Sequence, residues 1–256
     1  MKIAGFQMQA VLGEVEANLA KIDAAAGKAA AQGVRLLIAP ELALTGYGAG
    51  DLFPALASPA DGPLTQQLSQ IARRHGLTIV AGFAEKDRES VYNSAFLTDG
   101  KGQTATYRKS HLYGPYERQW FRPEAPSSVL ATIDGIRLGM LICYDVEFPE
   151  NVRRLAQAGA DLVVVPTALP SGWSGAFIAE HMIRVRAFEN QVFVAYVNHC
   201  GTDDRFTYAG LSRIAAPDGS LLAEAPAEGE ALIVAEIDPA TFHSSRSENT
   251  YLADLR

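Results

Sequence analysis

Three side chains that could act together in nucleophilic catalysis are Glu41, Lys109 and Cys143. Each stands where a short apolar run, which reads as a strand, comes to an end. Because the strand ends of one sheet can converge on a shared cleft, we expect the carboxylate, the amine and the thiol to lie close together. A free thiol has a pKa near 8.5, so only about 3% of it is thiolate at pH 7. A neighbouring ammonium lowers that pKa and a carboxylate can accept the proton, which would activate the sulfur.

Each of the three residues also has an ordinary structural explanation. Glu41 could be a solvated loop acid, Lys109 a surface cation and Cys143 core packing, because most free cysteines are small buried hydrophobes. Their spacing alone leaves the catalytic and the structural interpretations open.

The segment around Cys143 predicts a buried strand that turns directly into a helix. An apolar run stops at Cys143, a short acidic turn follows, and Pro149 opens the helical stretch 150–156. Proline is tolerated in a first helical turn because its missing N–H would be unpaired there anyway. A side chain at this position stands at the rim of a sheet, near backbone N–H groups that could bind an anion.

The composition is that of an ordinary soluble globular protein. The chain has 256 residues, 48% of them hydrophobic and 20% charged, which suits one large domain or two small ones. Its net charge of −7 argues against nucleic acid and anionic membranes as partners. No basic region precedes a long apolar run at its start, and no apolar segment approaches the ~20 residues of a membrane helix. Its two cysteines, Cys143 and Cys200, provide no disulfide framework, so we expect a cytoplasmic setting.

The periodicity predicts helices and strands interspersed along the chain, with β-hairpins among the βα units. A purely parallel, doubly wound sheet is therefore disfavoured, and we expect a single α/β domain over 1–256, with two sheets and helices on both outer faces. The predicted helices cover 16–32, 64–75 and 180–190; the main predicted strands cover 3–8, 34–39, 78–83, 136–142, 161–166 and 191–198; and hairpin turns are expected at 99–102 and 134–135.

Other groups of residues predict little chemistry. The loop 46–50 contains G-x-G, but no third glycine follows, so we expect no dinucleotide site. The segment 198–200, with Asp203 and Asp204, lacks ligand pairs at zinc spacing, so we expect no metal and a packing or loop-lining role. Arg184 and Arg186 fit surface or interface ions better than ligands.

Three short motifs, at 40–41, 108–112 and 143–150, resemble the three signature regions of the nitrilase, or carbon–nitrogen hydrolase, superfamily. They occur in the expected order and at the expected distances. The similarity extends nearly from end to end, through 184–190 and the turn at 217–219.

The resemblance implies a four-layer αββα sandwich and a Glu-Lys-Cys triad that needs no cofactor. In it, Glu41 corresponds to the general base, Lys109 to the cation that stabilises the tetrahedral intermediate, and Cys143 to the nucleophile. Glu117 corresponds to a second glutamate that positions the substrate or the lysine. The backbone N–H of Tyr144 corresponds to the other oxyanion donor, and losing one such donor typically costs about 10²–10³ in rate.

Within this superfamily the chain most resembles small bacterial amidases of the 5-aminopentanamidase and R-stereoselective amidase kind. Cys143 is followed by Tyr and Asp rather than Trp and Glu, which weakens a nitrile-hydrolase interpretation, and an arginine pair typical of N-carbamoyl amino acid hydrolases is absent from the turn. The expected substrate is therefore a small primary amide. Nitrile hydrolysis at the same triad and a non-catalytic binding subunit are the alternatives. The resemblance also implies a homodimer or larger assembly through helices near 150–158 and 180–190.

The residues of the substrate pocket are less clear from the sequence. Trp173 could wall the pocket or pack in the ordinary way. Asp145, Glu147 and Glu150 follow the nucleophile with no arginine before Arg153, so they favour a substrate whose far end is an ammonium. Each of these acids could instead face solvent or cap the following helix, the better explanation for at least two of them.

Overall fold

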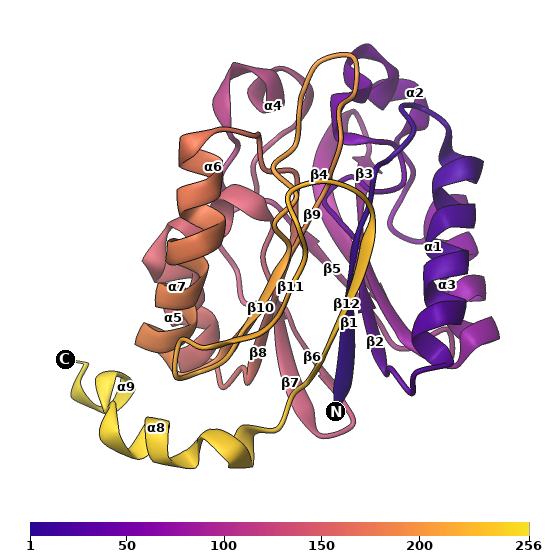
Figure 1. The fold of residues 1–256 in the computed structure, drawn as a ribbon. Helices are drawn as coiled ribbons and strands as arrows, with labels where there is room; N and C mark the ends of the chain where they lie inside the picture. The colour runs from indigo at the N-terminus through magenta and orange to yellow at the C-terminus, as the bar shows by residue number, and fades with distance from the viewer. Residues whose placement is uncertain (256) are drawn as a thin grey trace.

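Two six-stranded sheets pack face to face, and helices cover their outer sides, as seen in the computed structural model of residues 1–255 (Figure 1). This is the αββα sandwich expected from the sequence. The strands are β1 (Lys2–Gln7), β2 (Leu36–Ile38), β3 (Thr78–Asp87), β4 (Ser90–Thr98), β5 (Thr104–Arg108), β6 (Leu130–Ile133), β7 (Ile136–Met140), β8 (Leu162–Thr167), β9 (Phe193–Asn198), β10 (Arg213–Ala215), β11 (Leu221–Glu224) and β12 (Ala231–Glu236). The α-helices are α1 (Val15–Ala30), α2 (Phe53–Leu56), α3 (Pro63–His75), α4 (Gly114–Trp120), α5 (Pro149–Gln157), α6 (Trp173–Phe177), α7 (Ile183–Asn190), α8 (His243–Glu248) and α9 (Tyr251–Asp254).

The two sheets have similar, mixed topologies. The first has the order β12-β1-β2-β3-β4-β5 and the second β11-β10-β9-β8-β7-β6. In each, three parallel strands (β1, β2 and β3, or β7, β8 and β9) are flanked by antiparallel ones. The parallel strands are buried on both faces, which explains their nearly continuous apolar sequences.

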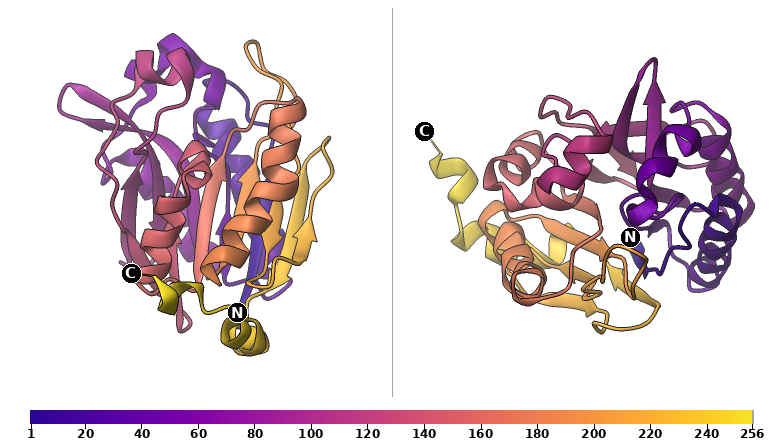
Figure 2. Two further views of the ribbon diagram at one scale, coloured as in Figure 1. Left: turned by 90° about the vertical axis from the view of Figure 1, so that its left-hand side faces the viewer. Right: turned by 90° about the horizontal axis from the view of Figure 1, so that it is seen from above.

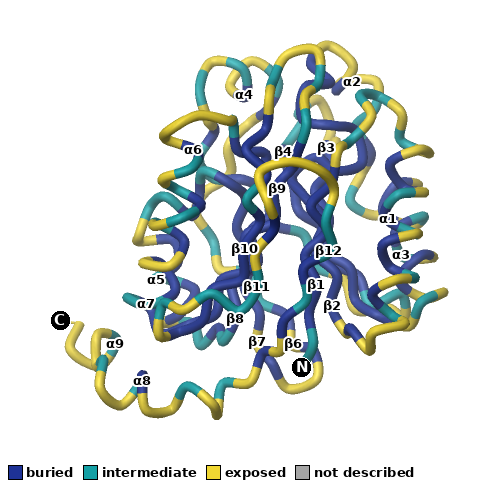
Figure 3. Tube along the Cα trace, in the orientation of Figure 1, coloured by how far each residue is buried: buried dark blue, intermediate teal, exposed yellow. Residues whose placement is uncertain are grey.

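Strand β2 shows how its residues are divided between two apolar layers. Leu36 and Ile38 pack between the sheets, whereas Leu37 faces the layer formed with α1 and α3. The alternation follows from the period of two residues in a strand. The buried strands form the centre of the molecule, and the exposed residues lie on the outer faces of the helices and on the loops (Figure 3).

Helices α1 and α3 cover the first sheet, and α5, α6 and α7 lie over the second (Figures 1 and 2). The C-terminal helices α8 and α9 lie outside the sandwich, at the end that contains the N-terminus. No helix among residues 1–255 has the length and apolar character needed to cross a membrane.

Most of the local predictions are confirmed. The helix predicted at 64–75 ends at Gly76, whose φ of 66° is the left-handed conformation of a helix C-terminus. The β6–β7 hairpin turns at Asp134 and Gly135, both with positive φ, as a two-residue type I′ turn requires. Two predictions are wrong. The loop at 46–50 lies largely in a 3₁₀ helix, Tyr47–Leu52, and the helix expected at 180–190 begins already at Trp173 and passes through a π-helical turn, Ile178–Met182.

Candidate active site

The three predicted catalytic residues come together, but they come from two sheets and not from one. Glu41 follows β2 and Lys109 follows β5, both in the first sheet, whereas Cys143 follows β7 in the second. The expectation of a single sheet edge is therefore wrong. The site forms where the loops of two sheets, packed face to face, meet at the same end of the sandwich.

Lys109 lies between two carboxylates in a fully buried cluster. Its Nζ donates to Glu41 Oε1 at 2.7 Å and to Glu117 Oε1 at 2.6 Å, and all three side chains have no exposed surface. Asn93 Nδ2 donates to Glu41 Oε1 at 2.6 Å, and the Tyr47 hydroxyl donates to Glu117 Oε1 at 2.9 Å. The second carboxylate oxygen of Glu41, Oε2, is buried and has no hydrogen-bond partner among the described residues. It is therefore free to accept a proton.

The charges of this cluster shift one another's pKa values. Burial by itself would lower the pKa of Lys109, but Glu117 and Glu41 outweigh it and hold that pKa well above its usual range. Burial raises the pKa of Glu117 to about 7 despite the opposing charge of Lys109, and the charge of Glu41 adds to the increase. Lys109 is thus an ammonium at neutral pH, and Glu117 titrates there.

Cys143 opens the 3₁₀ helix Cys143–Glu147 with a φ of 45°, a left-handed conformation that is rare for a residue other than glycine. Burial raises the pKa of its thiol well above the usual range, and the charge of Glu41 adds to this. Lys109 and a backbone hydrogen bond from Ala168 act in the opposite direction. Lys109 thus lowers this pKa, as the sequence predicted, but burial and the Glu41 carboxylate outweigh it. The thiol therefore keeps its proton at neutral pH.

A buried carboxylate, Asp145, joins the loop that follows Lys109 to the turn that carries Cys143. Asp145 Oδ1 accepts from Ser110 Oγ and from the backbone N–H of His111, each at 2.8 Å, and Oδ2 accepts from the Tyr107 hydroxyl at 2.9 Å. With this many donors and no exposed surface, Asp145 holds the site together and is inaccessible to substrate.

Arg186 fixes the other side of the same turn. Its Nε donates to the Val146 carbonyl at 2.8 Å and its Nη2 to the Glu147 carbonyl at 2.6 Å, while Nη1 pairs with Glu189 Oε1 at 2.9 Å. Arg184 is exposed, as predicted, whereas Arg186 is buried and is therefore not a surface ion of the single chain. Nothing in the sequence distinguishes the two arginines, because the difference is which face of α7 meets the turn.

From the sequence, the segment around His199 was expected only to pack or to line a loop. In the structure His199 positions the main chain of Glu41. It follows β9 in the second sheet, is buried, and its Nε2 lies 2.7 Å from the Glu41 carbonyl oxygen. Its Nδ1 lies 3.1 Å from the Met8 carbonyl, which already accepts from the Cys200 N–H at 3.0 Å. We therefore assign the proton to Nε2, and burial lowers the pKa of the ring. His199 thus links the main chain of Glu41 to the sheet that carries Cys143.

A cavity of about 490 Å³ opens beside Cys143, a size that suits a small molecule. Tyr144 and Glu147 line it together with Cys143. Trp173 stands at its edge, 78% exposed and stacked on Phe177 with ring centroids 5.4 Å apart, so it forms a rim and not an inner wall.

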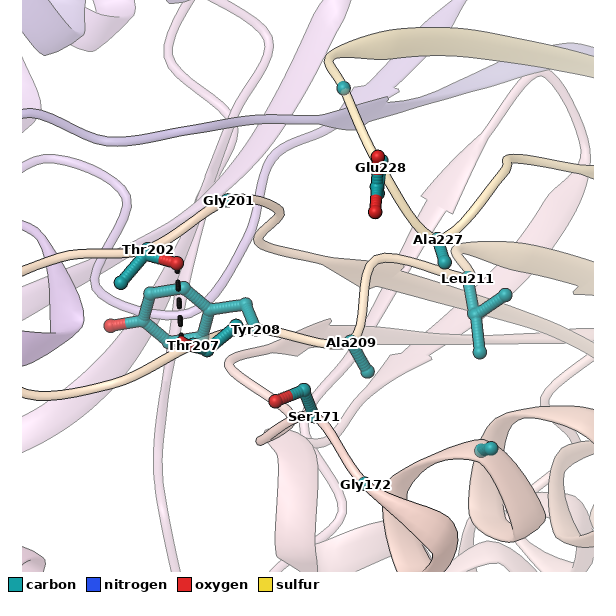
Figure 4. A pocket seen from close by; sticks show the side chains of 12 residues that line it. Ser171, Gly172, Gly201, Thr202, Thr207, Tyr208, Ala209, Leu211, Ala227 and Glu228 are labelled. Atoms are coloured by element: carbon teal, nitrogen blue, oxygen red, sulfur yellow. Dashed lines mark hydrogen bonds between the residues drawn. The ribbon is translucent and has the colours of Figure 1, made fainter.

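A second hollow, of about 460 Å³, lies next to Ser171 and Gly172 (Figure 4). It shares Ser171 and Gly172 with the first and is otherwise lined by residues such as Tyr208 and Leu211. It contains none of the predicted catalytic residues, so the first cavity is the candidate active site. Among residues 1–255, no three His, Cys, Asp or Glu side chains are grouped so as to hold a metal ion.

The sandwich of two mixed sheets matches the fold of solved amidase structures, one of which carries an adduct on its active-site cysteine. The chain belongs to the carbon-nitrogen hydrolase family, whose sequence profile matches residues 2–247. It is an amidase of the nitrilase superfamily and acts on carbon–nitrogen bonds other than peptide bonds.

Individual relatives match along the whole chain. It is 42% identical over 259 residues to a Pseudomonas protegens protein named "hydrolase in pqqF 5′ region", covering 100% of this chain and 89% of the relative. It is 36% identical over 258 residues to an (R)-stereoselective amidase of a Pseudomonas species, covering 100% and 92%. The amidase of Nesterenkonia sp. AN1 superimposes with a TM-score of 0.89 at 34% identity, covering 100% of this chain and 96% of that one. That structure is of a variant with glutamine in place of a glutamate, and acrylamide has added to its active-site cysteine.

Proposed function

We propose that this amidase hydrolyses a small primary amide to the carboxylic acid and ammonia through a thioester on Cys143. The observation that supports this is the buried arrangement of Lys109 between Glu41 and Glu117, next to the cavity that Cys143 lines. A base, a cation and a nucleophile are the groups that acyl transfer through a thioester needs.

In the first half of the reaction, Cys143 attacks the amide carbon while Glu41 takes the thiol proton. The unpaired Oε2 of Glu41 supports this assignment, because it is the oxygen with a free lone pair. Lys109 and the Tyr144 N–H stabilise the oxyanion of the tetrahedral intermediate. The proton held by Glu41 then passes to the nitrogen, the carbon–nitrogen bond breaks and ammonia leaves.

In the second half, a water molecule attacks the thioester while Glu41 accepts its proton. The tetrahedral intermediate collapses, the proton returns to the sulfur and the carboxylic acid is released. Glu117 holds Lys109 in position from the side opposite Glu41. This sequence returns every group to its starting protonation state.

The test is to trap the acyl-enzyme and to locate it. The enzyme is mixed with an amide, quenched in acid within one turnover, digested and analysed by mass spectrometry for an acyl group on the peptide that contains Cys143. Cys143→Ala should abolish both the adduct and ammonia release, and Cys200→Ala, at the other buried cysteine, should retain both. Ammonia release by Cys143→Ala, or an acyl group on Cys200, would contradict the proposal.

We further propose that the substrate is an amino-amide. Of the three acids near the nucleophile, only Glu147 lines the cavity, and no arginine, lysine or histidine lines it, so the pocket suits an ammonium better than a carboxylate. The comparison to make is kcat/KM for 5-aminopentanamide, pentanamide and glutaramate, with pentanenitrile as a fourth substrate. Equal values for the three amides would leave a general amidase. Ammonia from the nitrile at a similar rate would favour the alternative of nitrile hydrolysis.

We also propose a homodimer or larger assembly, a single domain over residues 1–256 and a cytoplasmic setting. Phe177 and Val185 are large apolar residues, 43% and 50% exposed, on the helical run from α6 to α7, where association is expected. Light scattering of the wild type and of Val185→Glu tests the assembly. A monomeric wild type would refute it.

A further inference from the structure

The acids that follow the nucleophile have three different fates. Asp145 is buried and hydrogen-bonded, and Glu150 is exposed in the first turn of α5. Glu147, at the end of the 3₁₀ helix that Cys143 opens, lines the same cavity as the nucleophile. One of the three acids is therefore placed to meet the substrate.

The carboxylate of Glu147 has no cation of its own among residues 1–255. It takes part in none of the ion pairs of the described chain. Arg186, although close, donates to the main-chain carbonyl of Glu147 and pairs with Glu189. Lys109 is occupied by its two catalytic carboxylates. The pocket therefore has one unpaired acid in its wall.

The remaining lining of the cavity carries no other acid and no basic group. It consists of glycines and of aromatic, aliphatic, hydroxyl and thiol side chains, among them Tyr113, Tyr144 and Trp173. Burial raises the pKa of Glu147 to about 7, with Lys109 and Arg186 acting in the opposite direction. A substrate cation beside this carboxylate would favour its ionised form, as an opposite charge does in general.

We propose that Glu147 is the specificity-determining residue of the pocket and binds the ammonium group of an ω-amino amide, an inference that rests on the proposed amidase function. Cys143 and Glu147 are the first and last residues of one 3₁₀ helix, and both line the cavity, so this turn carries the thiol at one end and the acid at the other. The cavity of about 490 Å³ has room for a substrate that spans both residues, with methylene groups between its amide and its ammonium.

The first experiment measures selectivity. It compares the ratio of kcat/KM for 5-aminopentanamide to kcat/KM for pentanamide in the wild type, in Glu147→Gln and in Glu150→Gln, the exposed acid that serves as matched control. The ratio should fall at least tenfold, about 1.4 kcal/mol, in Glu147→Gln and stay unchanged in Glu150→Gln. Glu147→Lys should reverse the preference toward glutaramate. An unchanged ratio in Glu147→Gln, or a wild type that prefers glycinamide to 5-aminopentanamide, would overturn the proposal.

The second experiment needs no turnover, so it separates this inference from the proposed reaction. The rate at which iodoacetamide alkylates Cys143 is measured with butylammonium or with butyrate present. Butylammonium should protect the thiol of the wild type better than butyrate does, and this difference should vanish in Glu147→Gln. Equal protection by both ions in the wild type would refute ammonium binding at Glu147. If protection follows this pattern but no amide releases ammonia, the proposed amide hydrolysis is refuted, whereas ammonium binding at Glu147 is supported.

Discussion

Replacing Lys109 by methionine removes one positive charge from between two buried carboxylates while keeping a side chain of similar length. Glu41 and Glu117 would each lose a hydrogen bond of 2.6–2.7 Å to Nζ, with no exposed surface to rehydrate them. Removing one partner of a buried ion pair typically costs about 3–5 kcal/mol. We therefore expect a loss of this size in the free energy of unfolding near neutral pH, and a fall of at least about 10²-fold in kcat from the lost oxyanion donor.

The pH dependence of this loss follows from the charges that remain. Burial already raises the pKa of Glu117 against the opposing charge of Lys109, so without this cation the folded-state pKa of Glu117 lies further above its unfolded value. Such a group contributes stability at low pH and loses it as pH rises through the folded pKa. The gap between wild type and Lys109→Met should therefore be larger at about pH 8 than at about pH 5.

The assay is urea unfolding at these two pH values, followed by tryptophan fluorescence, together with ammonia release for kcat. Lys21→Met is the control, because its ion pair with Glu230 is partly exposed and should be worth only about 0–1 kcal/mol. A loss below about 1 kcal/mol at pH 8 would refute the reasoning. So would a gap that widens toward acid.

Three further outcomes are expected. The ratio of kcat/KM for 5-aminopentanamide to kcat/KM for pentanamide should fall as the pH drops below about 7, because Glu147 is then protonated. Titration of Glu117 affects both substrates equally and cancels in this ratio, so a ratio that does not change with pH would contradict the prediction. His199→Leu should lower kcat more than it raises KM, because the main chain of Glu41 loses a hydrogen bond. His199→Gln should restore part of the lost kcat, because its amide N–H can replace Nε2, and equal losses of kcat in the two variants would show that His199 only packs. Gly82→Ala should lower both thermal stability and kcat, because its Cβ would lie 2.6 Å from Glu41 Cα. A wild-type kcat would contradict this and would show that the backbone near Glu41 can shift without a cost to catalysis.

Much of the local structure was determined by the sequence. Pro149 at a helix start, Gly76 at a helix end and the Asp134 turn each depend on the backbone preferences of a few neighbouring residues, and each was predicted. The three candidate catalytic residues were also found from sequence, because each belongs to a short motif. Such features need no knowledge of what packs against them.

The tertiary structure alone decided how these parts meet. Glu41 and Cys143 lie on different sheets, so no local pattern could show that His199 links them or that burial would raise the thiol pKa. Asp145 and Glu147 are two residues apart and chemically alike, yet one is enclosed by donors and the other lines the pocket. The reason is physical: desolvation and ion pairing depend on groups that are distant along the chain, and only packing of the two sheets brings these groups together.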